Sequence, residues 1–97
     1  MPVTVVVELT LAPKDASNTV TQLAHTLSDT RDFDGCLGIQ LLVDQGDESH
    51  VLLLEQWESR EHQERYMEWR ASSGASSIGP DAFVAAPRIA FFDSRAP

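Results

Sequence analysis

The stretch Val51–Ser73, VLLLEQWESREHQERYMEWRASS, contains a strand and a helix joined by a very short connection. Residues 51–57 are apolar apart from Glu55 and Gln56, which predicts a β-strand. Ser59 is suited to be the N-cap of a helix that runs from Arg60 to about Arg70. A strand followed directly by a helix indicates a mixed α and β domain.

The rest of the chain repeats this alternation of strands and helices. Residues 3–11, VTVVVELTL, are rich in β-branched side chains, and the polar segment 44–49, DQGDES, is typical of a hairpin turn. The predicted elements are strands at 3–11, 36–43, 51–57 and 88–92, helices at 15–30 and 60–70, and a short helical piece at 80–85. This order is the split βαβ plan of the α+β ferredoxin-like fold, a four-stranded antiparallel sheet with both helices on one face. We expect one domain over 1–97, with a core at about 3–92 and a tail at 93–97.

Apolar residues occupy both faces of the predicted sheet. In the first strand Val5, Val7, Leu9 and Leu11 share one face and Val6 lies on the other. In the second strand Leu37, Ile39 and Leu41 lie opposite Leu42. In the third strand Val51, Leu53 and Trp57 lie opposite Leu52 and Leu54. Two helices cover only one face, and the other face would normally be polar if it met water. We therefore predict a homodimer in which two sheets stack face to face as a dimeric α+β barrel.

Composition excludes several classes of partner. The 97 residues include 7 Lys and Arg against 15 Asp and Glu, a net charge of −8, which argues against binding to nucleic acid or to an anionic membrane surface. The single cysteine, Cys36, forms no disulfide within the chain, and the three histidines have no metal-site spacing. No signal-peptide or membrane-span pattern occurs, so we expect a cytoplasmic protein. Because the histidines and the cysteine show no metal-site spacing, we also expect no bound metal.

The two predicted helices differ in their inward faces. The first carries an apolar stripe, and its members are Val20, Leu23, Ala24 and Leu27, with Ala16 and Arg31 near it. The second carries large amphipathic groups, and these are His62, Tyr66, Trp69 and Ser73, bordered by Gln63 and Arg70. Either these side chains fill the core, or they line a cavity that holds a flat ligand.

Glu55 stands out within the third predicted strand because it shares a face with Val51, Leu53 and Trp57. A carboxylate buried there needs a partner or a raised pKa. The sequence leaves two interpretations open for it, the lining of the same cavity or a position at the sheet edge or dimer rim.

These residues also form a family pattern. Glu55, Trp57, Ser59 and Glu61 give E-x-W-x-S-x-E before the second helix, and the second strand opens with the glycine-led segment 35–38, GCLG. From Val3 to Phe92 the chain resembles the antibiotic biosynthesis monooxygenase family. The resemblance implies a ferredoxin-like, dimeric α+β barrel.

The resemblance also implies an activity, the cofactor-independent oxidation of anthrones, quinols or related polycyclic phenols by dioxygen. A base removes a proton from the small aromatic substrate, and the resulting anion reduces dioxygen. By resemblance His62 is the base or hydrogen-bond donor, Tyr66 orients the substrate, Trp69 stacks on it and Arg70 stabilises the anion. Many relatives place a histidine later in this helix, where this chain has Tyr66 and Met67.

Two other functions remain open at this stage. The dimeric barrel would also suit a module that binds a hydrophobic metabolite without converting it. The superfamily further includes isomerases of small phosphorylated or oxo metabolites, which would need a cationic pocket built from only seven basic residues.

Overall fold

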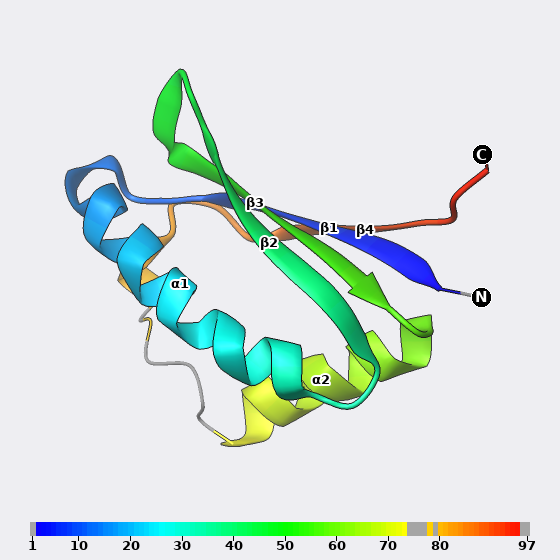
Figure 1. Ribbon diagram of the computed structural model, residues 1–97. Coiled ribbons are helices and arrows are strands. Elements are labelled where there is room, and N and C mark those ends of the chain that lie inside the picture. The colour runs from blue at the N-terminus through cyan, green and yellow to red at the C-terminus, as the bar shows by residue number, and fades with distance from the viewer. Residues whose placement is uncertain (1, 74–77, 79, 96–97) are drawn as a thin grey trace.

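A four-stranded antiparallel sheet forms the scaffold in the computed structural model, which describes residues 2–73, 78 and 80–95. Its strands lie in the order β2-β3-β1-β4, with α1 and α2 together on one face (Figure 1). The bounds are β1 Val3–Thr10, α1 Ala16–Asp32, β2 Cys36–Asp44, β3 Asp47–Trp57, α2 Arg60–Ser73 and β4 Arg88–Phe92. The predicted split βαβ fold is confirmed. Residues 74–77, 79, 96 and 97 lie outside the described part, and the last two belong to the predicted tail at 93–97.

The β2–β3 hairpin is longer than predicted, because the polar segment 44–49 belongs mostly to the strands. Asp44 accepts the Gly46 N–H at 2.8 Å, which tightens the turn. Asp47 accepts both the N–H and the hydroxyl of Ser49, at 3.0 and 2.6 Å. Side chains that satisfy their own turn therefore allow the ladder to continue into polar sequence. The predicted helical piece at 80–85 shortens to a 3-10 turn at Pro80–Ala82.

The helix-facing side of the sheet forms the core. In β1 every second residue from Val3 to Leu9 is buried, and each pairs with an inward residue of β3, such as Val5 with Glu55. The prediction that Leu37 lies on the same face of the sheet as Ile39 and Leu41 is wrong. The register shifts between Cys36 and Gly38, so Leu37 is left 56% exposed while Ile39 is buried.

Both helices are rotated relative to their predicted stripes. In α1 the buried positions are Ala16, Thr19, Leu23, Leu27 and Thr30, whereas Ala24 and Arg31 are exposed. In α2 the buried positions are Gln63 and Tyr66, whereas His62 is half-buried and Trp69 is 36% exposed. The side chain of Ser73 lies outside the described part. Residue spacing locates the inward stripe of a helix to within about one residue, and packing against the sheet decides which of those residues are buried.

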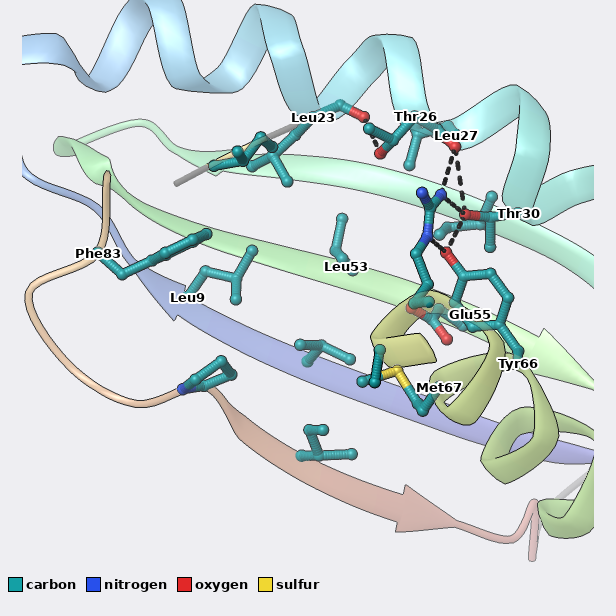
Figure 2. Close-up of a pocket in the computed structure, with 17 residues that line it drawn as sticks. Leu9, Leu23, Thr26, Leu27, Thr30, Leu53, Glu55, Tyr66, Met67 and Phe83 are labelled. Carbon is teal, nitrogen blue, oxygen red and sulfur yellow. Dashed lines mark hydrogen bonds between the residues drawn. The ribbon is translucent and has the colours of Figure 1, made fainter. Parts of the chain in front are cut away.

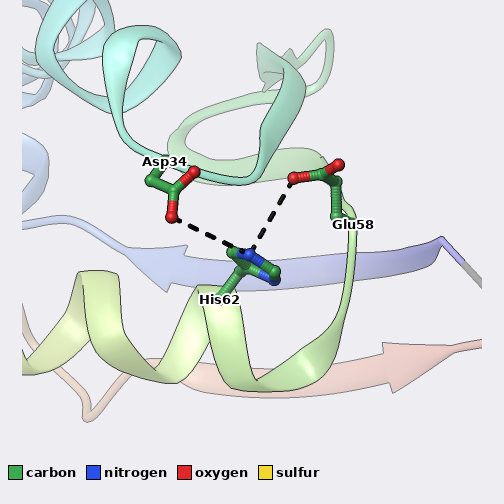
Figure 3. A group of neighbouring side chains, drawn as sticks. All are labelled: Asp34, Glu58 and His62. Carbon is green, nitrogen blue, oxygen red and sulfur yellow. Dashed lines mark ion pairs between the residues drawn. The ribbon is translucent and has the colours of Figure 1, made fainter.

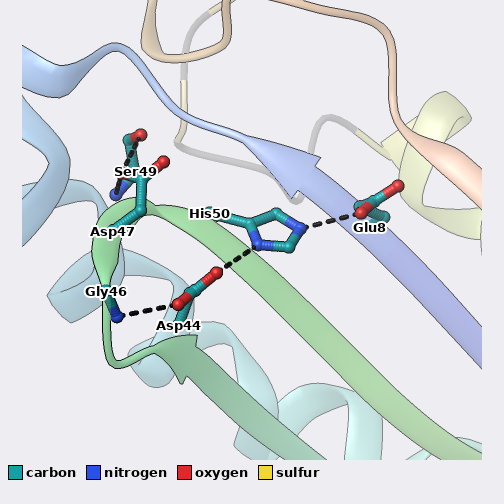
Figure 4. Close-up of polar contacts among 6 residues, drawn as sticks. All are labelled: Glu8, Asp44, Gly46, Asp47, Ser49 and His50. Carbon is teal, nitrogen blue, oxygen red and sulfur yellow. Dashed lines mark hydrogen bonds and ion pairs between the residues drawn. The ribbon is translucent and has the colours of Figure 1, made fainter.

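The other face of the sheet carries no helix (Figure 1). Val6, Leu52 and Leu54 stand at its centre, half-buried, and Phe92 lies exposed on β4. A polar group occupies one end of this face, where His50 lies between Asp44 and Glu8 (Figure 4). None of the described helices is long and apolar enough to span a membrane.

Candidate functional site

A cavity of about 360 Å³ lies between the sheet and the two helices (Figure 2). Its volume is within the range of small-molecule sites. The described residues that line it are mostly apolar, and they are Val7, Leu9, Leu23, Thr26, Leu27, Thr30, Ile39, Leu53, Glu55, Tyr66, Met67, Arg70, Ala71, Ile78, Phe83, Pro87 and Ile89. The space beside α2 is therefore open, as the functional interpretation of its amphipathic face requires.

Glu55 brings a carboxyl group to the floor of this cavity. It lies near the end of β3, an inner strand of the sheet, is only 3% exposed, and pairs with Val5 on one side and Ile39 on the other. The Trp57 indole N–H donates to its Oε1 at 2.8 Å. Burial raises the pKa of the Glu55 carboxyl above its ordinary value, and the bond from Trp57 opposes that rise. A carboxyl with a raised pKa in an apolar cavity is suited to proton transfer.

Tyr66 and Arg70 bring polar groups from α2 to the same cavity and join them to α1 (Figure 2). Arg70 Nε donates to the Tyr66 hydroxyl at 2.6 Å, and Nη2 donates to the Thr26 carbonyl at 3.0 Å and to Thr30 Oγ1 at 3.3 Å. Thr30 Oγ1 lies 2.6 Å from the Tyr66 hydroxyl and donates to the Thr26 carbonyl. Since Thr30 has one hydroxyl hydrogen, Tyr66 donates in the bond that joins them. We call Thr26, Thr30, Tyr66 and Arg70 the α1–α2 latch.

The remaining two predicted site residues do not line the cavity. Trp69 stands beside the latch, its ring 5.4 Å from the Arg70 guanidinium and 5.5 Å from the Phe33 ring. His62 lies in the first turn of α2, where its Nδ1 is 2.7 Å from the hydroxyl of Ser59. The structure therefore brings Tyr66 and Arg70 together at the cavity and leaves His62 and Trp69 outside its lining.

His62 instead makes its contacts where the β3–α2 connection meets the first turn of α2. Ser59 accepts the His62 backbone N–H at 3.3 Å, so the predicted N-cap is confirmed. The imidazole ring packs on Gly35, where a Cβ would overlap it, and Gly35 has a φ of +89°. Its Nε2 faces the carboxylates of Asp34 and Glu58 (Figure 3).

Sequence reasoning missed two polar lining residues, Thr26 and Thr30. A signal for Thr30 was present, since it continues the spacing of Leu23 and Leu27 on the buried stripe of α1. A threonine on such a stripe needs a hydrogen-bond partner. The sequence marks Glu55 as an acidic residue within an apolar strand face, and its place in the cavity lining decides between the two interpretations of that residue.

Comparisons with known proteins agree with this architecture. The solved structure of PA3566 from Pseudomonas aeruginosa superposes with a TM-score of 0.83 at 23% identity, over 98% of this chain and 95% of that chain. Rv0793 from Mycobacterium tuberculosis gives 0.74 at 19% identity, over 100% and 98%. A third structure, described as an antibiotic biosynthesis monooxygenase, gives 0.81 at 18% identity, over 97% and 99%. At these identities the likeness establishes the fold. No curated protein matches the chain significantly.

A family model carries the assignment further than the superpositions do. The model described as antibiotic biosynthesis monooxygenase matches residues 2–76, more than half of the chain. That match includes β1 to β3, both helices and the whole E-x-W-x-S-x-E segment. The chain belongs to the antibiotic biosynthesis monooxygenase family.

Proposed function

We propose that the chain is a cofactor-independent monooxygenase that oxidises a small phenol, anthrone or quinol with dioxygen. Family membership supports a monooxygenase-like function in general. The observation that carries the finer proposal is that a buried carboxyl, Glu55, and a guanidinium, Arg70, both line an otherwise largely apolar cavity. A flat, neutral aromatic molecule fits such walls, and its acidic proton and its oxygen would each meet a charged group.

In the proposed reaction the Glu55 carboxylate removes a proton from the substrate, and Arg70 stabilises the negative charge that develops on the substrate oxygen. The anion then gives its electrons to dioxygen, which bonds to the carbon that carried the charge. The protonated Glu55 returns its proton to the resulting peroxide, and loss of water from the hydroperoxide leaves a new carbonyl group. One substrate and one dioxygen thus yield one oxidised product and one water, and all electrons come from the substrate. The apolar walls exclude water from the anion.

Tyr66 has a positioning role in this scheme. Its hydroxyl hydrogen is directed to Thr30, and it accepts a hydrogen bond from Arg70. The phenol therefore holds the guanidinium in place beside the cavity. The roles predicted for His62 and Trp69 are not used here because neither side chain lines the cavity, and we assign the proton transfer to Glu55.

Oxygen uptake by the purified full-length chain tests the proposal. Anthrone and a naphthoquinol are supplied as probes, with EDTA present and no flavin added. We expect saturable uptake of one dioxygen per substrate, above the uncatalysed rate. The Glu55→Gln variant should lose 10²–10⁴-fold in kcat, the usual contribution of a general base. Uptake that does not change in this variant would contradict the assignment of the base.

A binding function without catalysis is the second candidate. The observation in its favour is that Arg70 already donates to Tyr66, Thr26 and Thr30, so its guanidinium is held by protein groups. A saturable aromatic ligand with no product after hours would support this candidate and contradict the oxygenase. An isomerase of phosphorylated metabolites is less suited, since Arg70 is the one basic residue among the described lining residues.

The open face of the sheet supports a further part of the proposal, that the chain acts as a homodimer through this face. Leu52, Leu54 and Val6 form an apolar centre, and the half-buried position of each leaves surface for a partner. A second copy would bring the same patch, as a two-fold interface requires. Binding to nucleic acid or membranes is not expected at a net charge of −8. The cytoplasmic location stays a prediction.

A further inference from the structure

A second group of polar side chains lies outside the cavity, where the α1–β2 connection meets the start of α2. Asp34 comes from the α1–β2 connection, Glu58 and His62 come from the β3–α2 connection and the first turn of α2, and each offers one ligand atom (Figure 3). These three atoms all lie within 4.8 Å of one another. We propose that the group binds a divalent transition-metal ion, with Zn²⁺ the best match, at a site that takes no part in the proposed oxidation. One imidazole nitrogen with two carboxylate oxygens is a ligand set that zinc accepts.

The imidazole of His62 is held in an orientation that suits a metal ligand. Its Nδ1 is 2.7 Å from the Ser59 hydroxyl, and one face of the ring packs on Gly35. Histidines that bind metals usually have their second ring nitrogen fixed by such a hydrogen bond. The other nitrogen, Nε2, is directed at the carboxylates of Asp34 and Glu58.

The distances leave room for an ion between these groups. His62 Nε2 is 3.9 Å from Asp34 Oδ2 and 3.9 Å from Glu58 Oε2, too far for direct hydrogen bonds. Two ligands about 2.1 Å from a tetrahedral zinc ion are separated by about 3.4 Å. The carboxylates are exposed, so each side chain is free to close the difference of about half an ångström. A single cation would then neutralise both.

His50 provides a contrast within the same chain. Its two ring nitrogens lie 2.9 Å from Asp44 Oδ2 and 2.7 Å from Glu8 Oε2 (Figure 4). Direct hydrogen bonds already join these three side chains, so both nitrogens are occupied. The same residue types thus form a closed polar network at His50 and a more open arrangement at His62.

Charge also favours a cation at the proposed site. Among the described residues, the ion pairs formed by Asp34 and Glu58 are with His62 alone, and neither carboxylate is paired with a lysine or arginine. The whole chain carries a net charge of −8. Three protein ligands leave the fourth zinc position to water, so we expect an affinity lower than that of a closed four-ligand site. Bound zinc would tie the α1–β2 connection to α2 and raise the melting temperature.

Calorimetric titration of the full-length, EDTA-treated chain with ZnCl₂ tests the proposal. We expect one ion per chain, a melting temperature that rises with zinc, and an affinity at least tenfold weaker in His62→Ala. Because His62 packs on Gly35, the shape-preserving double variant Asp34→Asn/Glu58→Gln checks the same loss without removing the ring. The matched control is Asp44→Asn/Glu8→Gln, which alters the His50 network and should leave zinc binding unchanged.

Spectra of the Co²⁺-loaded chain add a readout of the ligands themselves. We expect a d–d absorption band in the wild type that disappears in His62→Ala. The proposal is overturned by zinc binding that persists unweakened in the double variant, by binding that depends on the His50 network, or by no binding at millimolar zinc. Turnover of anthrone in EDTA should be unaffected by the double variant Asp34→Asn/Glu58→Gln, so this test and the oxygenase test fail independently.

Discussion

Glu55 is the residue on which the proposed chemistry depends, and its environment acts on it in two directions. Its burial on the helix-facing side of β3 removes water from the carboxyl, which penalises the charged form. The Trp57 indole supplies one hydrogen bond that favours the charged form. Ionisation of Glu55 in the folded chain therefore costs free energy, although Trp57 supplies a hydrogen bond to the carboxyl.

The Glu55→Gln variant should be more stable than the wild type at high pH. The pKa of the Glu55 carboxyl is about 4.3 in the unfolded chain and higher in the folded chain. At pH values between these two pKa values, the folded state binds more protons than the unfolded state. Stability then falls as pH rises through that window, and the loss remains above it. We expect the variant to melt a few degrees higher at about pH 8 and to match the wild type at about pH 4, as measured by circular dichroism.

The exposed residue Glu68 on α2 provides the matched control. Its change to glutamine removes the same charge without relieving a buried carboxyl. A stability gain of the same size in Glu68→Gln, or one that does not depend on pH, would argue against the cost assigned to Glu55.

At the scale of elements, the α1–α2 latch joins the two helices at one end of the cavity. Thr30 is its centre, since it contacts Tyr66 and Arg70 of α2 and the Thr26 carbonyl of its own helix. Both helices rest on the sheet through apolar contacts, which have no preferred direction. The latch therefore sets the spacing of the helices through directional hydrogen bonds.

Thr30→Val should destabilise the chain by about 1–3 kcal/mol, because it leaves the Tyr66 hydroxyl and the Arg70 guanidinium short of an acceptor. For a domain of this size that corresponds to a loss of roughly 4–8 °C per kcal/mol in melting temperature. Thr21→Val on the exposed face of α1 removes only a bond to the Ser17 carbonyl and should stay within about 0.5 kcal/mol. Equal effects of the two changes in thermal melts would show that the latch adds nothing.

At the scale of the whole molecule, one face of the sheet is covered by helices and the other is not (Figure 1). The uncovered face combines an apolar centre with the polar His50 network at one end. Apolar surface gives affinity, while polar groups at the margin of an interface give it a preferred alignment. An apolar centre with polar groups at its margin is the arrangement that a specific homodimer requires.

Leu54→Lys should convert the proposed dimer into a monomer, since it places a charge at the centre of the open face. Light scattering after size exclusion would give the mass of two chains for the wild type and of one chain for the variant. The melting temperature of the wild type should also rise with protein concentration, as it does for dimers that fold and associate together. The exposed hairpin variant Glu48→Lys serves as the control and should remain dimeric. A monomeric wild type at micromolar concentration would contradict the proposal.

Local periodicity explains why the fold was predictable and the site only in part. The alternation in β1 and the helix start at Ser59 are properties of neighbouring residues, so a short window of sequence contains them. The latch joins Thr30 to residues 36 and 40 positions away, and no local pattern records that contact. A small rotation of α2 likewise decided that Arg70 lines the cavity and His62 does not. Glu55 was recognisable because an acidic residue in an apolar strand contradicts its surroundings.

The hydrogen bond from Trp57 to Glu55 has an optical consequence. Indole emission responds to a charge placed beside the ring, so the fluorescence of Trp57 should change as the carboxyl gains or loses its proton. The chain contains two tryptophans, and Trp69→Phe would leave Trp57 as the single emitter. The bond at 2.8 Å thereby makes the ring a built-in reporter of the protonation state of Glu55, in the resting chain and during turnover.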